Sequence, residues 1–134
     1  MSAKKYDLIF SLGAACLCSS MLRKKNLQIH SYPLDWVFGG DFTSRVDLLV
    51  SDFADYINKE DLVFTGKQNE AKNNLCDIYF NKRTNMGFNH DFPVGLPFEE
   101  AFPIVKAKYE RRINRLIENI NRAKDILIVY TVPP

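Results

Sequence analysis

The chain has 134 residues, and 46% of them are hydrophobic, which is enough to bury a core and indicates one domain over residues 1–134. A net charge of +2 is too small to indicate nucleic-acid binding, so we expect no nucleic-acid partner. The sequence has neither a long apolar run nor a signal-peptide pattern, so we expect no membrane partner and a cytoplasmic location.

The cysteine and histidine content argues against disulfides and metals. Cys16, Cys18 and Cys76 are an odd number in a chain long enough to fold without covalent staples. With only two histidines, His30 and His90, the sequence lacks the four ligands of a structural zinc site. We therefore expect free thiols, no metal and no cofactor, and these counts leave the oligomeric state unknown.

The chain begins with a predicted strand, turn and helix. An apolar stretch from Tyr6 to Phe10 predicts the strand, and small residues from Ser11 onward follow it. Apolar residues at helical spacing then predict a helix from about Ala14 to Lys25. This order places Cys16 in the first turn of a helix, directly after a strand.

The middle of the chain is predicted to hold a helix and several short strands. The helix begins near Asp41 or Thr43, either of which can cap it. Its apolar face is expected to comprise Val46, Leu49, Val50, Phe53 and Ile57. Strands are expected from Leu62 to Phe64, from Cys76 to Phe80 and, as a hairpin partner, from about Phe88 to Phe92, with a loop over residues 66–74.

The last part of the chain predicts the longest helix and a final strand. The helix runs from about Phe98 or Pro103 to Ala123, and its apolar stripe is Val105, Tyr109, Ile113, Leu116, Ile117 and Ile120. The apolar run from Ile126 to Val132 is typical of a strand buried on both faces. The alternation indicates an α/β fold with an open, mainly parallel sheet and flanking helices, truncated after the last strand.

Cys16 is the leading candidate nucleophile. Unpaired amides at a helix start, together with the helix dipole, favour an anion, so a thiol there tends toward its thiolate. In open parallel sheets, active sites also gather at the carboxyl ends of strands. The alternative is a buried cysteine that serves as a small hydrophobe where a helix packs closely on a sheet.

A thiol nucleophile needs a base, and His90 is the better of the two histidines because aromatic residues flank it. Asp91 is not expected to orient His90, since adjacent side chains in a strand point to opposite faces. Asp35 lies in a rigid aromatic turn and is the candidate third member, with Trp36 beside it. The alternatives are a histidine satisfied within a hairpin and a turn or capping aspartate.

Four blocks of the sequence resemble a bacterial family named papain-like cysteine peptidases. The blocks run from Phe10 to Cys16, from Tyr32 to Trp36, from His90 to Phe92 and from Lys108 to Ile113. The resemblance extends from Leu8 to about Val129 and implies that Cys16 and His90 form the catalytic pair. It also implies a helix-plus-barrel arrangement and a further segment after the last strand, whereas the periodicity favours an open α/β sheet, which we expect here.

The chain departs from the family pattern in two ways. Ala14 and Ala15 carry no side-chain donor, so backbone amides near Ala15 and Cys16 must stabilise an oxyanion. The residue that orients the imidazole in papain-like enzymes follows the histidine in the chain, and no position here is assigned to it.

The long helix also carries a basic group: Lys106, Lys108, Arg111, Arg112 and Arg115. A guanidinium fork binds two oxygens of a carboxylate or phosphate at once, so Arg111 or Arg112 is a candidate contact for an anionic substrate. The alternative is a solvated helix face that pairs with Glu110 and Glu118.

Two functions follow from these residues. The first is a thiol-dependent hydrolase or acyl transferase for a small molecule or peptide, which can be anionic, with Cys16 as nucleophile and His90 as general base. Its expected substrate contacts are Ser11, Gly13, Trp36, Arg111 and Arg112. The second is a non-enzymatic module for a phosphorylated sugar or nucleotide, with the turn from Ser11 to Cys16 as an amide cradle and Arg111 or Arg112 as a clamp. A shortened chain that kept the fold and lost activity is a third possibility.

Overall fold

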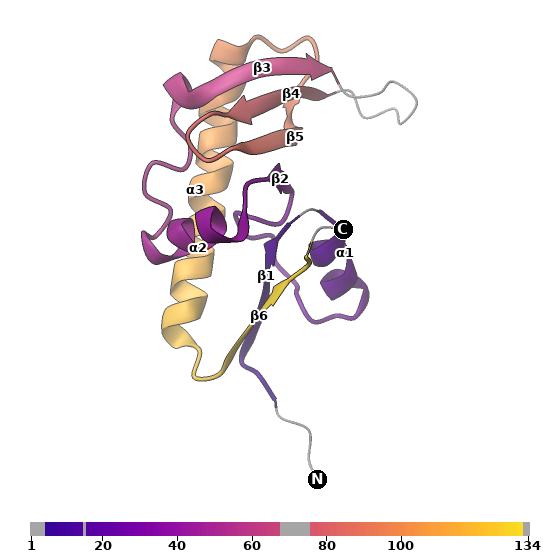
Figure 1. The fold of residues 1–134 in the computed structure, drawn as a ribbon, viewed down its shortest axis with the longest axis vertical. Coiled ribbons are helices and arrows are strands. Elements are labelled where there is room, and N and C mark those ends of the chain that lie inside the picture. Colours follow the sequence, from indigo (N-terminus) through magenta and orange to yellow (C-terminus); the bar gives the residue numbers. More distant parts are fainter. Residues whose placement is uncertain (1–4, 15, 68–75, 133–134) are drawn as a thin grey trace.

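The computed structural model describes residues 5–14, 16–67 and 76–132 (Figure 1). Its helices and strands follow in the order β1 (Leu8–Gly13), α1 (Cys16–Lys24), β2 (Val37–Gly39), α2 (Phe42–Val50), the 3-10 helix η1 (Lys59–Asp61), β3 (Leu62–Lys67), β4 (Cys76–Asn81), β5 (Met86–Pro93), α3 (Phe98–Arg122) and β6 (Ile126–Tyr130). Most predicted elements are therefore present, with ends that differ by a few residues. The predicted loop at residues 66–74 lies mostly outside the described residues.

The strands form two sheets. β1 pairs with β6 in parallel, and the other four strands form an antiparallel sheet in the order β2-β5-β4-β3 (Figure 1). The predicted α/β class is confirmed, but parallel pairing is confined to β1 and β6 instead of forming one mainly parallel sheet. The predicted hairpin of β4 and β5 is confirmed, and the Asn81 side chain stabilises its turn by accepting hydrogen bonds from the amides of Arg83 and Thr84. The sheet is antiparallel because β2 and β3 pair with the two edges of this hairpin, which the sequence did not indicate.

The second helix has the predicted cap and most of the predicted apolar face. Asp41 caps α2 by accepting a hydrogen bond from the Ser44 amide at 2.7 Å, as predicted. The predicted apolar face is confirmed except at Val50, which is 78% exposed: Phe53 and Ile57 are buried, and Val46 and Leu49 pack against the core. Within α2 the fully buried residues are Arg45 and Leu48, which were not predicted. An arginine at a buried position breaks the apolar periodicity on which the prediction rested.

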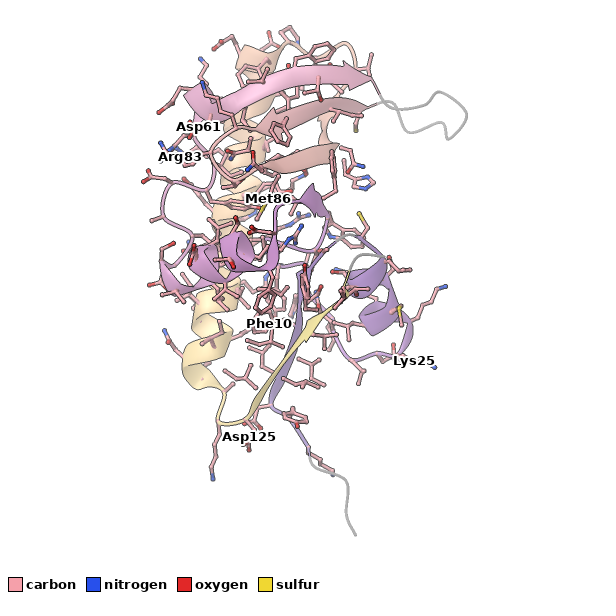
Figure 2. The ribbon with its side chains drawn as sticks, viewed as in Figure 1. Phe10, Lys25, Asp61, Arg83, Met86 and Asp125 are labelled. Atoms are coloured by element: carbon pink, nitrogen blue, oxygen red, sulfur yellow. The ribbon has the colours of Figure 1, made fainter. Side chains whose placement is uncertain are left out.

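The long helix α3 extends along the antiparallel sheet and reaches the β1–β6 pair (Figure 1). One contiguous core joins these layers, and Phe10 on β1 and Met86 on β5 are both fully buried in it (Figure 2). Aromatic rings of Tyr56, Phe88 and Tyr109 meet at its centre, with centroids 5.3 to 6.0 Å apart.

The last strand, β6, is more exposed than predicted. Leu127 is 36% and Ile128 45% exposed, so the expectation of burial on both faces was wrong. Among the described strands β6 pairs with β1 alone, so it lies at the edge of a two-stranded sheet and not inside a larger buried one. None of the described helices combines the length and the apolar character needed to cross a membrane.

Candidate active site

The structure brings the two predicted catalytic residues together from a helix and a strand that lie far apart in the sequence. Cys16 is the first residue of α1, directly after β1, and His90 lies on β5. The Cys16 Sγ is 3.5 Å from the His90 Nε2, although the residues are 74 positions apart. Cys16 is half-buried and His90 is exposed, so the pair lies at the surface. A sulfur and a ring nitrogen at this distance can exchange a proton.

The environment of Cys16 opposes a free thiolate. Burial raises the pKa of the Cys16 thiol, and the nearby carboxylate of Asp91 adds to this increase. The backbone amide of Cys16 and the guanidinium of Arg45 lower the same pKa but do not outweigh burial. The backbone amide at the helix start lowers the pKa of Cys16, as predicted, but burial raises it more. The thiol therefore stays protonated near neutral pH and needs a base.

His90 and Asp91 point to opposite faces of β5, as expected for adjacent strand residues. His90 is exposed, whereas the buried Asp91 accepts a hydrogen bond from the Tyr109 hydroxyl at 2.8 Å and another from Lys108. The ring that contacts His90 is Trp36, whose centroid lies 6.4 Å away in an edge-on arrangement. Pairing of β2 with β5 places Trp36 there, because Trp36 immediately precedes β2.

Asp35 lies inside the protein, with 0% exposure, and holds the chain around α1. Its carboxylate accepts hydrogen bonds from the Ser19 hydroxyl at 2.8 Å, the Gln28 amide at 2.5 Å and the Tyr32 backbone amide at 2.7 Å. Burial raises the pKa of Asp35, and these three hydrogen bonds oppose the increase. None of its three donors is His90, so the structure joins Asp35 to the helix of Cys16 and not to the imidazole.

Ser11 and Gly13 are also buried, and their contacts shape the turn before Cys16. The Ser11 amide donates to the Gln28 side chain at 3.2 Å, and the Ser11 hydroxyl accepts from the Gly13 amide at 3.1 Å. Gly13 has a φ of +115°, which favours glycine. Ala15, which was expected to supply an oxyanion amide, lies outside the described residues.

Arg45 is a residue of the site region that the sequence analysis missed. It is 0% exposed and donates hydrogen bonds only to backbone carbonyls, and no carboxylate pairs with it among the described residues. Its acceptors are the carbonyls of Leu12, Ala14, Val37 and Gly39, at 2.7 to 3.2 Å. Arg45 therefore joins the end of β1, which leads to Cys16, to β2, which pairs with the strand of His90. No sequence signal marked it, because a lone arginine on a helix is most often exposed.

Substituting Gly13 by Ala is expected to lower the free energy of unfolding by at least about 2 kcal/mol. A Cβ at this position would lie 2.0 Å from Arg45 Nη1, so the arginine must move away from its carbonyl acceptors. The matched control is Gly95→Ala, since Gly95 also has a positive φ (+90°) but nothing within 4 Å of its Cβ position. Urea unfolding of both variants checks this, and equal losses would contradict the role given to Arg45.

Arg111 and Arg112 lie on α3 and line a cavity with residues 29–31. None of the described residues of the turn from Ser11 to Cys16 lines that cavity. The structure thus separates the two groups that the binding-module hypothesis combined. Among the described residues, no cluster of three or more His, Cys, Asp or Glu side chains is placed to hold a metal ion.

A thiol at the start of a helix with an imidazole within proton-transfer distance is the arrangement that cysteine-dependent hydrolases use. The chain belongs to the family described as "Putative papain-like cysteine peptidase", which matches residues 7–133. Two strands of parallel sheet and a four-stranded antiparallel sheet build this site, and neither closes into the barrel that the resemblance implied.

A named relative comes from a virus. The chain is 26% identical over 135 residues to "Uncharacterized protein R408" of Acanthamoeba polyphaga mimivirus, and the match covers 91% of this chain and 60% of that protein. The chain thus spans well under two thirds of that relative, and the bacterial origin of the family stays a prediction. No solved structure matches the chain.

Proposed function

We propose that this chain is a thiol-dependent hydrolase or acyl transferase in which Cys16 is the nucleophile and His90 the general base. The observation that carries the proposal is the 3.5 Å distance between the Cys16 Sγ and the His90 Nε2. Because burial raises the pKa of Cys16, the thiol depends on the imidazole to lose its proton during attack.

The reaction begins when His90 Nε2 takes the Sγ proton as the sulfur attacks a substrate carbonyl carbon. The resulting oxyanion collapses, the bond to the leaving group breaks, and His90 gives its proton to that group. A water or another acceptor then attacks the thioester carbonyl while His90 accepts its proton. This second attack releases the acyl product and restores the thiol.

The described groups suited to the oxyanion are few. The backbone amide of Cys16 acts on its own sulfur, and we assign it to the developing negative charge as well. The positive charge of Arg45 also favours an anion at this position, since it lowers the pKa of Cys16. Asp35 does not contact the reacting atoms. It is a positioning residue in this proposal, because its hydrogen bond with Ser19 fixes α1, the helix that carries Cys16.

The substrate is a carbonyl compound, either a peptide or a small molecule, bound beside the Cys16–His90 pair. Trp36 is half-buried and contacts the His90 ring, so its indole is suited to form one wall of the substrate site. Cys16, Cys18 and Cys76 form no disulfide with one another, so the Cys16 thiol is available for this chemistry.

Alkylation of Cys16 by iodoacetamide tests the proposal without a known substrate. Near neutral pH we expect His90→Gln to slow labelling of Cys16 by about 10²-fold, because the general base is lost. His30→Gln is the matched control, since it removes the other histidine and leaves the pair intact. Fragment-ion masses must separate Cys16 from Cys18, which is two residues away and buried. Equal rates in both variants would show that the imidazole does not activate this sulfur.

The pH dependence of the same reaction tests the raised pKa. In His90→Gln only the thiolate that forms unaided reacts, so its labelling rate follows the ionisation of Cys16. Because burial raises the pKa of this thiol above its ordinary value of 9.0, the rate should still be increasing at that pH. A plateau below pH 9.0 would mean that the helix start and Arg45 outweigh burial, contrary to our assignment.

A further inference from the structure

A second polar site, whose lining includes neither Cys16 nor His90, lies where α3 passes the segment at residues 29–31. A cavity of about 310 Å³ opens between them, at the lower end of the range for small-molecule sites. Its α3 wall consists of Lys108, Arg111, Arg112 and Arg115. The spacing of these residues places all four cations on one face of the helix.

The positive charge of this cavity is largely unbalanced. Lys108 pairs with Asp91, but no carboxylate pairs with Arg111, Arg112 or Arg115 among the described residues. The alternative in which these arginines pair with Glu110 and Glu118 is therefore not found among the described ion pairs. Like charges at these helical spacings destabilise a helix, so the cluster costs stability unless an anion occupies the cavity.

Arg112 also has an unused hydrogen-bond donor. Its guanidinium lies over the Tyr109 ring, 5.3 Å from the centroid, and its Nη1 is buried with no hydrogen-bond partner. A buried donor without an acceptor is unfavourable, so the Arg112 side chain gains a hydrogen bond when a small rotation turns Nη1 toward a ligand oxygen in the cavity. Arg115 is already oriented, because its Nη1 donates to the Ser31 carbonyl at 3.1 Å on the opposite wall.

We propose that this cavity is a binding site for a phosphate group, free or carried by a larger molecule. Three unpaired guanidinium groups match the charge of about −2 and the three acceptor oxygens of a phosphate monoester better than the single charge of a carboxylate. The planar forks of the arginines bind such oxygens in pairs. The cavity lining includes neither Cys16 nor the turn before it. Phosphate binding here can therefore be tested independently of the proposed thiol chemistry.

Trp36 provides a built-in reporter for this site. It is the only tryptophan of the chain, and its indole nitrogen donates to the Ser31 hydroxyl at 3.2 Å, on the wall of the cavity. Inorganic phosphate is titrated into the full chain at constant ionic strength, above the second phosphate pKa of about 6. Trp36 fluorescence and calorimetry follow binding in parallel. Calorimetry detects binding even if the fluorescence of Trp36 does not change.

We expect saturable phosphate binding that Arg111→Gln weakens about tenfold, because one charged hydrogen-bonding group is lost. Arg112→Lys should weaken it as well, since lysine keeps the charge but not the fork. The matched control is Lys106→Gln. It removes one positive charge from α3, but Lys106 lines a different cavity, so phosphate binding should be unchanged. Methyl phosphate that binds as well as inorganic phosphate identifies a phosphorylated molecule as the ligand, and weaker binding identifies free phosphate.

Three results would overturn the proposal. The first is the absence of saturable phosphate binding by both fluorescence and calorimetry. The second is equal weakening by Arg111→Gln and Lys106→Gln, which would mean that only the general charge of the helix attracts the anion. The third is binding of acetate as tight as that of phosphate, which would assign the site to carboxylates.

Discussion

Substituting Arg45 by Met should lower the free energy of unfolding by about 3–5 kcal/mol. The guanidinium donates to the backbone carbonyls of Leu12, Ala14, Val37 and Gly39, and methionine would leave all four without this donor. A loss of this size is a large part of the total stability of a domain, which is about 5–15 kcal/mol. Urea unfolding measures it directly.

The loss is smaller than the sum of the broken hydrogen bonds. Burial lowers the pKa of Arg45, which shows that the charged guanidinium is held inside at a cost that methionine does not carry. The control is Arg122→Met at the exposed end of α3, expected to change stability by less than about 0.5 kcal/mol. Similar losses in both variants would contradict the structural role of Arg45.

Arg45 joins the end of β1 to β2, so we expect it to fix the distance between Cys16 and His90. Arg45→Lys keeps the charge but cannot reach four carbonyls with one ammonium group. In that variant we expect a folded chain whose Cys16 alkylation depends less on His90 than in the wild type. This reduced dependence would separate positioning from the simple electrostatic effect of a nearby cation.

Turnover of an activated ester should fall by about 10²–10⁴-fold in His90→Gln. The imidazole must take the proton from a thiol whose pKa burial raises, and then give it to the leaving group. A neutral substrate such as p-nitrophenyl acetate is suitable, because it does not need the cationic cavity on α3. The release of nitrophenolate measures the rate.

Two matched variants make this result specific. Cys16→Ser should lose the same activity, whereas Cys18→Ser should retain it, because a serine hydroxyl can still donate to the Val129 carbonyl as the Cys18 thiol does. His30→Gln should also be active. If Cys16→Ser kept most of the wild-type rate, the ester would be cleaved elsewhere on the protein.

Periodicity was sufficient to predict most helices and strands of this fold. The apolar stripe of α3 and the alternation of β4 and β5 come from local spacing. All three elements lie close to where they were predicted. The hairpin of β4 and β5 was also predicted, but the pairing of β2 and β3 with its two edges was not, because spacing along the chain does not reveal which distant strands pair. The exposure of β6 depends on its partner strands, which spacing does not reveal.

The candidate site was predictable only where its chemistry is local. Cys16 at a helix start and His90 between aromatic residues carry visible signals, and the structure places them 3.5 Å apart. Asp35 was selected as a catalytic carboxylate, but its hydrogen bonds lead to Ser19, Gln28 and Tyr32. Arg45 had no signal at all, since its acceptors are carbonyls whose positions exist only in the folded chain.

The most direct test of the central claim is the mass of the intact protein after a short pulse of the activated ester. We predict that one acyl group is added at Cys16, and that His90→Gln, once acylated, releases this group more slowly than the wild type because water lacks its base. Fragment-ion masses then locate the group. An acyl group found on another residue, or a wild-type chain that never gains one while the ester is consumed, would contradict the assignment of Cys16 as the nucleophile.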